Sequence, residues 1–261
     1  MRTATSSRRA WSLPGRALTS AGAIAPVLSP TEIRFKAMHA ARTQNQSQEE
    51  RGRRALNIAV AVLGIILTAP VMLAVALLVR LTSRGPVIYK QHRVGVDRRL
   101  SRGPGSMNHR RRADRGGRIF TIYKFRTMRV DQGTGARQVW ASKHDPRITP
   151  VGRFLRATRL DELPQLFNVL QGDMNIVGPR PEQPEIFANL QEELGHYRNR
   201  QRVLPGITGL AQIELGYDTD IEGVKKKVSL DLEYIQRRSA AKDLLIMART
   251  VPVMVFQKVW M

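Results

Sequence analysis

Cysteine is absent from the 261-residue sequence, which excludes a disulfide scaffold, a thiolate nucleophile, cysteine-ligated zinc and iron–sulfur clusters. The five histidines never stand four residues apart, so the spacing of a helical two-histidine metal site is missing. The sequence also lacks a phosphate-binding Gly-x-x-x-x-Gly-Lys loop, a dinucleotide-binding glycine fingerprint and a Gly-x-Ser-x-Gly nucleophile elbow. Any catalytic chemistry must therefore depend on other side chains.

Acidic residues are scarce relative to basic ones. The chain holds 21 Asp and Glu against 43 Lys and Arg, a net charge of +22. A charge of this size indicates an anionic partner, such as nucleic acid, a membrane surface or a phosphorylated substrate. Residues 97–118 carry eight arginines but no Phe, Tyr or Trp on which bases could stack. We therefore interpret this segment as a solvated loop near anionic lipid headgroups, and we expect no nucleic-acid partner.

Residues 1–54 are basic and polar, with ten Lys and Arg, three Glu and no sustained apolar period. This composition is typical of a disordered basic arm. An organelle transit peptide shares the arginine-rich, acid-poor character, and a true start at Met38 would also explain the bias. We predict a disordered arm over residues 1–54.

One long apolar run follows the arm. Residues 55–79 contain no charge, and about 20 such residues suffice to cross the hydrocarbon core of a bilayer. Arginines stand on both sides of the run, and the positive-inside rule assigns both ends to the cytoplasm. Pro70 lies in the middle, where it removes a backbone donor and clashes with the carbonyl four residues earlier. These features favour a re-entrant membrane helix that consists of residues 55–80 and is broken at Pro70. An ordinary membrane span and a buried soluble helix are the less favoured alternatives.

The remaining residues, 81–261, have the mixed pattern of an α+β, helix-rich cytoplasmic domain. Short β-branched and aromatic runs predict a small β-hairpin, and apolar residues at helical spacing predict helices. An amphipathic stripe that begins at Leu244 fits either core packing or a helix in the membrane interface. The predicted strands are residues 87–90 and 119–123, and the predicted helices are residues 151–171, ending before Gly172, 185–200 and 222–238.

The polar residues best suited to chemistry are concentrated between residues 145 and 187. Asp161 and Glu162 are adjacent, and Pro164 after them marks the first turn of a helix. An aspartate at that position can cap the helix without any catalytic role. Three arginines precede the pair, however, and Arg180 lies between two prolines that restrict its backbone. Carboxylates beside arginines and a helix N-terminus also suit phosphate groups and a hard divalent cation.

The chain resembles the bacterial sugar transferases, the monotopic phosphoglycosyl transferases that make polyprenyl diphosphate sugars. The resemblance covers residues 52–252, in the family's order. It lies in six segments: Lys124-Phe125-Arg126-Thr127-Met128, Asp145-Pro146-Arg147-Ile148-Thr149, Leu160-Asp161-Glu162-Leu163-Pro164-Gln165-Leu166, Gly172-Asp173-Met174, Val177-Gly178-Pro179-Arg180-Pro181 and Pro205-Gly206-Ile207-Thr208-Gly209-Leu210-Ala211-Gln212.

Two features depart from the family's pattern. Residues 95–120 form a long basic loop where the family usually has a short glycine-containing turn. The additional membrane helices of larger members do not appear in residues 1–54, so we expect the minimal form of the family with an added arm.

The resemblance implies that a sugar-1-phosphate moves from a UDP-sugar to undecaprenyl phosphate with release of UMP, in exopolysaccharide, capsule or glycoconjugate biosynthesis. It maps the family's Asp-Glu pair onto Asp161 and Glu162. We expect Asp161 to be ionised at neutral pH, because the ordinary pKa of aspartate is about 3.9, and to form a covalent aspartyl intermediate. Glu162 is expected to assist through Mg²⁺, for which both carboxylates are candidate ligands.

The resemblance also implies a location and further site residues. The re-entrant helix, broken near a proline, would place the protein in the bacterial inner membrane, with the catalytic domain facing the cytoplasm and the anionic lipids of that leaflet. Candidate residues for binding phosphate and substrate are Arg156, Arg180, Lys124, Arg126 and Arg147.

Two other classes of function compete with this one. Asp218-Thr219-Asp220 matches the short Asp-x-Asp metal motif of glycosyltransferases that release UDP, although no Rossmann-like alternation surrounds it. A basic, membrane-attached nucleic-acid-binding protein would account for the charge and would bind DNA with a steep salt dependence. Release of UMP, of UDP or of neither separates the three.

Overall fold

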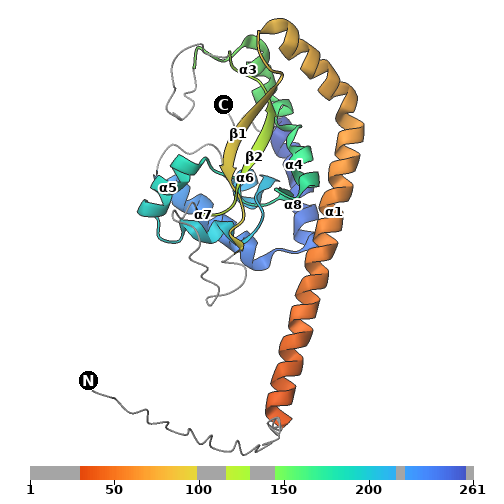
Figure 1. Ribbon diagram of the computed structural model, residues 1–261, viewed down its shortest axis with the longest axis vertical. Helices are drawn as coiled ribbons and strands as arrows, with labels where there is room; N and C mark the ends of the chain where they lie inside the picture. Colours follow the sequence, from red (N-terminus) through yellow and green to blue (C-terminus); the bar gives the residue numbers. More distant parts are fainter. Residues whose placement is uncertain (1–29, 99–115, 130–144, 216–220, 257–261) are drawn as a thin grey trace, which may run out of the picture. The chain divides into compact units, whose positions relative to one another are not determined.

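The computed structural model describes residues 30–98, 116–129, 145–215 and 221–256, with side chains described from residue 47 to residue 253 within these ranges. The chain divides into two units, Met1–Asn45 and Gln46–Met261. A long helix, Pro30–Thr82, begins in the first unit and continues into the second, which holds the rest of the described chain. Its elements are shown in Figure 1: α1 (Pro30–Thr82), β1 (Ile88–Val94), β2 (Ile119–Phe125), α3 (Pro150–Ala157), η1 (Leu160–Glu162), α4 (Gln165–Gln171), β3 (Asn175–Val177), α5 (Pro184–Glu193), η2 (Tyr197–Arg202), β4 (Gly206–Thr208), α6 (Leu210–Glu214), α7 (Ile221–Arg237) and α8 (Ala240–Phe256).

Helix α1 contains the apolar run and passes through Pro70 without interruption. The predicted break between two helices is thus corrected to a bend within one helix, which Figure 1 shows in the gold C-terminal part. Two local features weaken the helix there. Pro70 has no N–H to donate to the carbonyl four residues earlier, and the Thr68 hydroxyl donates to the Gly64 carbonyl at 2.7 Å, an arrangement that bends helices.

Residues 30–54 are also part of α1, which corrects the prediction that the whole of residues 1–54 is a disordered arm; residues 1–29 lie outside the described residues. The physical reason is visible around Arg53, which is 2% exposed and paired with Asp243. A buried ion pair of this kind orders the backbone that carries it. The basic composition alone does not reveal such a partner, because Asp243 is 190 residues away in the sequence.

Strands β1 and β2 pair antiparallel, from Ile88 opposite Phe125 to Val94 opposite Ile119. This confirms the predicted hairpin. Phe120, Ile122 and Phe125 of β2 are buried, so the strand contributes its apolar side chains to the core. Residues 99–115 of the connecting basic loop lie outside the described part of the chain.

The single helix predicted for residues 151–171 consists of three elements, α3, η1 and α4. Arg159 separates α3 from η1 because its backbone is left-handed, with φ of 60°, a conformation that is uncommon for residues other than glycine. Pro164 stands at the N-terminal boundary of α4. Gly172 ends α4 with φ of 83°, as predicted.

A second, parallel sheet pairs β3 with β4, and the sequence analysis did not predict it. Each strand is only three residues long. Gly178 and Gly206 permit the pairing, because a side chain at either position would collide with the backbone of the other. The close approach places the loop that follows β3, with Pro179, Arg180 and Pro181, against β4: Gly206 N–H donates to the Pro179 carbonyl at 3.0 Å.

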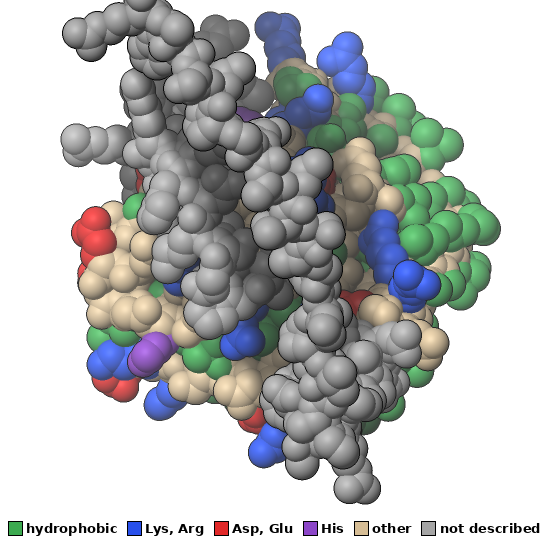
Figure 2. All heavy atoms as spheres, turned by 60° about the horizontal axis from the view of Figure 1, so that its bottom comes forward, with side chains coloured by type: hydrophobic (Ala, Val, Ile, Leu, Met, Phe, Trp, Pro, Cys, Tyr) green, Lys and Arg blue, Asp and Glu red, His purple; other side chains and the backbone are tan. Residues whose placement is uncertain are grey.

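The outer face of α1 is apolar. Between Ser47 and Thr82 the helix is long and apolar enough to cross a membrane, and only 11% of its most hydrophobic window is buried. Figure 2 shows hydrophobic side chains gathered on the side of the molecule where α1 lies. The most exposed of them in α1 are Leu63, Ile66, Leu67, Leu73, Leu77 and Leu81. Leu244, Leu245 and Val251 of α8, which belong to the predicted amphipathic stripe, are also exposed.

Candidate active site

Glu162 lies at the centre of a cluster of cations. Its Oε1 accepts from Lys124 Nζ at 2.6 Å and from Arg180 Nη2 at 3.0 Å. Its Oε2 lies 3.4 Å from Arg159 Nη1. Glu162 is 7% exposed, so these ion pairs are poorly screened by solvent. One carboxylate therefore positions three cationic side chains around its neighbour, Asp161.

Three separate elements bring these side chains together. Lys124 comes from β2, Asp161 and Glu162 form the turn η1, and Arg180 comes from the loop after β3. Asn168 fixes α4 against β2, since its amide donates to the Thr121 carbonyl at 2.7 Å and accepts from the Tyr123 N–H at 3.1 Å. The side chain of a buried asparagine thus sets the distance between the Asp161–Glu162 turn and Lys124.

The two adjacent carboxylates differ in their electrostatics. Burial opposes ionisation of Glu162, but Lys124, Arg180 and Arg159 hold its pKa well below the ordinary value. For Asp161, burial and the charge of Glu162 raise the pKa to about 6, against the opposing charges of Lys124, Arg159 and Arg156. Asp161 is still about nine tenths ionised at pH 7, although its pKa is higher than the sequence analysis assumed. Its Oδ1 is buried and has no hydrogen-bond partner among the described residues.

The helix-cap interpretation of Asp161 is not supported, because Asp161 lies inside η1 and the cap position of α4 belongs to Pro164. Arg156 is held at the site by a bond from its Nε to Thr127 Oγ1 at 2.9 Å. Lys124 and Arg180 also lie at the site, as predicted from the sequence. Arg159 was not among the predicted binding residues. It pairs with Glu162 beside a left-handed turn, and the spacing of residues in the sequence does not reveal such a turn.

Two other predicted residues are engaged elsewhere. The Arg126 guanidinium donates to the carbonyls of Pro86 and Ser83 at 2.6 and 2.7 Å, at the end of α1. Arg147 forms a two-point ion pair with Asp145, whose pKa it lowers to about 2. A phosphate-binding role for Arg126 or Arg147 stays a prediction, and it would require these contacts to be exchanged.

Behind Arg180 lies a buried charged group that the sequence analysis did not identify. Arg200 donates to Asp231 Oδ2 at 2.7 Å, to the Tyr197 hydroxyl at 2.6 Å and to the backbone carbonyl of Arg180 at 3.0 Å. Arg200 and Asp231 are 6% and 3% exposed. The group supports the loop that presents Arg180, and therefore the contact between Arg180 and Glu162.

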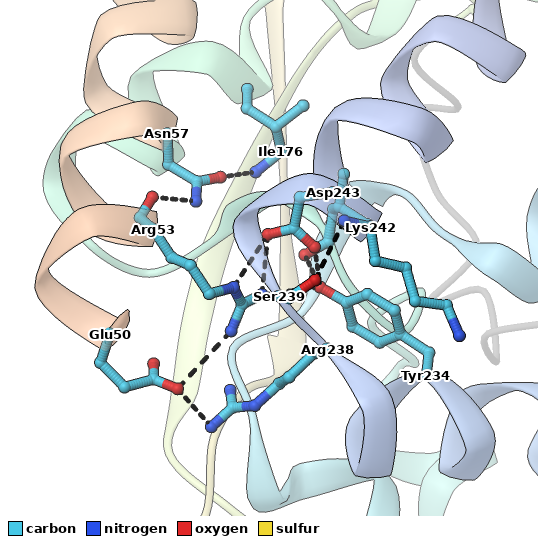
Figure 3. Close-up of polar contacts among 10 residues, drawn as sticks. Glu50, Arg53, Asn57, Ile176, Tyr234, Arg238, Ser239, Lys242 and Asp243 are labelled. Atoms are coloured by element: carbon cyan, nitrogen blue, oxygen red, sulfur yellow. Dashed lines mark hydrogen bonds and ion pairs between the residues drawn. The ribbon is translucent and has the colours of Figure 1, made fainter. Parts of the chain in front are cut away.

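A second buried network joins the middle of α1, around Arg53, to α7 and α8, as Figure 3 shows. Arg53 donates to Asp243 Oδ2 at 2.8 Å and to the Tyr234 hydroxyl at 2.8 Å, and Tyr234 donates to Asp243 Oδ1 at 2.7 Å. Glu50 accepts from Arg238 at 2.6 Å at the outer edge. The contacts fix the helix to the rest of the second unit, and they do not reach the cluster around Glu162.

Within the described residues no group of three or more His, Asp or Glu side chains is arranged to hold a metal ion. Asp161 and Glu162 nevertheless offer carboxylate oxygens, including the unpartnered Oδ1, and Mg²⁺ commonly binds one or two carboxylates together with substrate phosphates. The pair fits that mode of binding. The Asp218-Thr219-Asp220 motif lies outside the described residues.

The fold and the site define an α+β protein in which an apolar helix adjoins a buried Asp-Glu pair surrounded by arginine and lysine. A sequence model of the bacterial sugar transferases matches residues 48–257, and the chain belongs to this family.

Similar proteins include the UDP-N-acetylgalactosamine-undecaprenyl-phosphate N-acetylgalactosaminephosphotransferase of Aeromonas hydrophila, 40% identical over 76% of this chain and 42% of that protein. The UDP-glucose:undecaprenyl-phosphate glucose-1-phosphate transferase of Xanthomonas campestris pv. campestris is 41% identical over 76% of this chain and 37% of its own length. The chain thus spans about two fifths of these relatives. The exopolysaccharide production protein PSS of Rhizobium leguminosarum bv. phaseoli is 37% identical over 76% of this chain and 92% of its own length.

Proposed function

We propose that this protein is a phosphoglycosyl transferase that moves a sugar-1-phosphate from a UDP-sugar to undecaprenyl phosphate and releases UMP. The observation that carries the proposal is the buried Asp161 carboxylate, with a pKa of about 6 and with no hydrogen-bond partner for its Oδ1 among the described residues, next to a glutamate paired with three cations. The names of the relatives support the donor and acceptor classes.

In the first step an Asp161 oxygen attacks the β-phosphorus of the UDP-sugar. A bond forms between that oxygen and phosphorus, and the bond from phosphorus to the bridging oxygen breaks. The bridging oxygen leaves with the electron pair as part of UMP, and the sugar phosphate remains on Asp161 as a mixed anhydride. A carboxylate needs no general base for this attack.

In the second step a phosphate oxygen of undecaprenyl phosphate attacks the same phosphorus and releases Asp161 as a free carboxylate. The product is undecaprenyl diphosphate sugar. No proton or electron is left over in either step. Lys124, Arg159 and Arg180, which pair with Glu162, would stabilise negative charge on the transferring phosphate. Glu162 holds these cations in place.

Mg²⁺ remains part of the proposal. Asp161 and Glu162 would hold it, and when bound it would neutralise charge on the diphosphate. We also propose that α1 is re-entrant, entering one leaflet of the bacterial inner membrane, with the site facing the cytoplasm and its anionic lipids. The exposed apolar faces of α1 and α8 support contact with lipid. The Rhizobium relative's name supports a role in exopolysaccharide biosynthesis.

The test is to incubate membranes containing the protein with undecaprenyl phosphate and a panel of UDP-sugars, and to measure UMP and UDP separately. We expect UMP. Asp161→Asn keeps the size of the side chain and removes its charge, so it should abolish UMP release and the covalent sugar phosphate that labelled donor leaves on the wild type. Glu222→Gln, which removes an exposed carboxylate on α7, is the matched control and should retain both.

Three results would contradict the proposal. Release of UDP would favour an Asp-x-Asp glycosyltransferase. Normal turnover by Asp161→Asn would remove the nucleophile assigned here. A covalent adduct mapped to Glu162 would exchange the roles of the two carboxylates.

A further inference from the structure

A small recess of about 10 Å³, enough for one water-sized atom, lies beside the Glu162 cluster. It is lined by the side chains of three cations, one amide and two apolar residues: Arg93, Lys124, Arg180, Gln165, Ile122 and Pro181. Lys124 and Arg180 are the two cations that share Glu162 Oε1. The recess therefore lies next to the Asp161–Glu162 pair.

Two hydrogen-bond donors in the lining lack acceptors among the described residues. Gln165 is 2% exposed, and its Nε2 is buried without a partner. The Nε of Arg93 is buried without a partner as well. Buried donors in folded proteins are nearly always paired, and leaving one unpaired is unfavourable. Two such donors in one recess indicate that an oxygen from outside the chain, of a water molecule or of a ligand, completes them.

The charge of the recess indicates what kind of acceptor fits. Arg93 is held by bonds to the Pro181 carbonyl and to Gln91 Oε1, and the Glu182 carboxylate lies 3.9 Å from its Nη1. Burial lowers the pKa of Arg93, and the positive charge of Arg180 lowers it further against the opposing effect of Glu182. An acceptor with negative charge would satisfy both donors and reduce the repulsion between the two arginines.

We propose that one oxygen of a phosphate group occupies this recess and accepts hydrogen bonds from Gln165 Nε2 and Arg93 Nε. The identity of the ligand rests on the proposed transferase reaction. That reaction offers two sources of the same chemistry, the α-phosphate of the nucleotide and the phosphate of the lipid acceptor. Gln165 and Arg93 are then substrate-binding residues, distinct from the cations that Glu162 positions.

The first experiment measures binding without catalysis. Inorganic pyrophosphate is titrated into the full chain in detergent micelles, and the rise in melting temperature gives an apparent Kd. Gln165→Met and Gln165→Glu keep nearly the same volume, and Arg93→Met tests the second donor from another element. Each should weaken pyrophosphate binding by about tenfold or more, the scale of a lost hydrogen bond to a charged group. Gln165→Glu should weaken it most, because it adds a negative charge.

The matched control is Gln171→Met, at the exposed far end of the same helix, which should bind pyrophosphate as the wild type does. Unchanged affinity in both the Gln165 and the Arg93 variants would overturn the subsite. If one variant does not fold, the other two decide the outcome. If the wild type itself shows no stabilisation by pyrophosphate, the subsite is also refuted.

The second experiment distinguishes the two sources. A raised KM for the UDP-sugar in Gln165→Met, with the KM for undecaprenyl phosphate unchanged, assigns the recess to the nucleotide, and the reverse result assigns it to the lipid. If both constants equal those of the wild type, the recess binds no phosphate during turnover and the proposal fails. Absence of UMP release by the wild type would instead refute the proposed function, and the pyrophosphate titration would still test the recess.

Discussion

Under the proposed mechanism, replacing Glu162 with glutamine should lower the pKa that controls formation of the covalent intermediate. In the wild type, burial and the charge of Glu162 raise the pKa of Asp161 to about 6. Attack needs the ionised carboxylate, so the rate of adduct formation should rise with pH through about 6. The ionised fraction is about 0.9 at pH 7 and about 0.1 at pH 5, so the rate should fall roughly tenfold between them.

Glu162→Gln removes the like charge next to Asp161 and frees Lys124 and Arg159 from their ion pairs with Glu162. Both changes favour the ionised form of Asp161. The midpoint should move to lower pH, by on the order of one unit or more, which is the scale of a neighbouring charge. Lys124→Met should move it in the opposite direction, because Lys124 lowers the pKa of Asp161.

The assay is the initial rate at which labelled UDP-sugar attaches to the protein without lipid acceptor, measured from pH 4.5 to 8. Absolute rates should fall in both variants, since the cations lose their arrangement, but the midpoint is independent of that loss. Removing one partner of a buried ion pair costs about 3–5 kcal/mol, so melting curves must show that each variant is folded at the assay temperature. If Glu162→Gln leaves the midpoint unchanged or raises it, the electrostatic account of the pair is wrong.

Two further predictions concern more distant parts of the structure. Asp231→Asn leaves Arg200 buried without its charged partner, so we expect a lower melting temperature. Because Arg200 also bonds the Arg180 backbone, the KM for the UDP-sugar should rise, whereas the control Glu233→Gln in α7 should leave it unchanged. A normal KM in Asp231→Asn would show that the loop does not need this support. Pro70→Leu restores the backbone donor in α1 and should favour a straight span. Cysteines at Gln48 and Arg84, which we expect to be labelled only from the cytoplasmic side in the parent protein, should then become accessible from opposite sides. Labelling of one end from the periplasm in the parent would refute the re-entrant topology.

The hairpin could be predicted because both strands contain β-branched and aromatic runs, although β1 continues to Val94, four residues beyond the predicted strand 87–90. The sequence did not predict the pairing of β3 with β4, because three-residue strands carry little periodicity and the contact depends on two glycines that approach each other. The prediction of a single helix over residues 151–171 was wrong for a related reason. Its apolar spacing continues across Arg159, and spacing carries no information about a left-handed backbone at one residue.

The site was predicted in part. Asp161, Glu162, Lys124 and Arg180 could be named from the motifs, and the structure brings them together. Arg93 and Gln165 could not be, because their significance comes from unpaired buried donors rather than from residue type. Arg126 also belongs to a matching motif, but its guanidinium donates to carbonyls at the end of α1, so its phosphate-binding role stays a prediction.

The arginines before the apolar run also have a different role from the one their charges indicate. Arg53 is buried against Asp243, and Arg54 donates to the carbonyls of Val169 and Leu170 at the end of α4. Asn57, one turn further along α1, accepts from the N–H of Ile176 in β3. A charge count for topology should therefore omit Arg53, which is too buried to meet lipid headgroups.

These same contacts determine where the site lies. Helix α4 directly follows the turn that carries Asp161 and Glu162, and β3 directly precedes the loop that carries Arg180. Both elements are bonded to one face of α1 within a single turn of the helix. That turn lies at the beginning of the apolar run, so the two halves of the site are fixed relative to the point where the run starts. Under the proposed function this is where a lipid phosphate at the bilayer surface must meet Asp161, and a helix bonded to both halves holds them at the same depth.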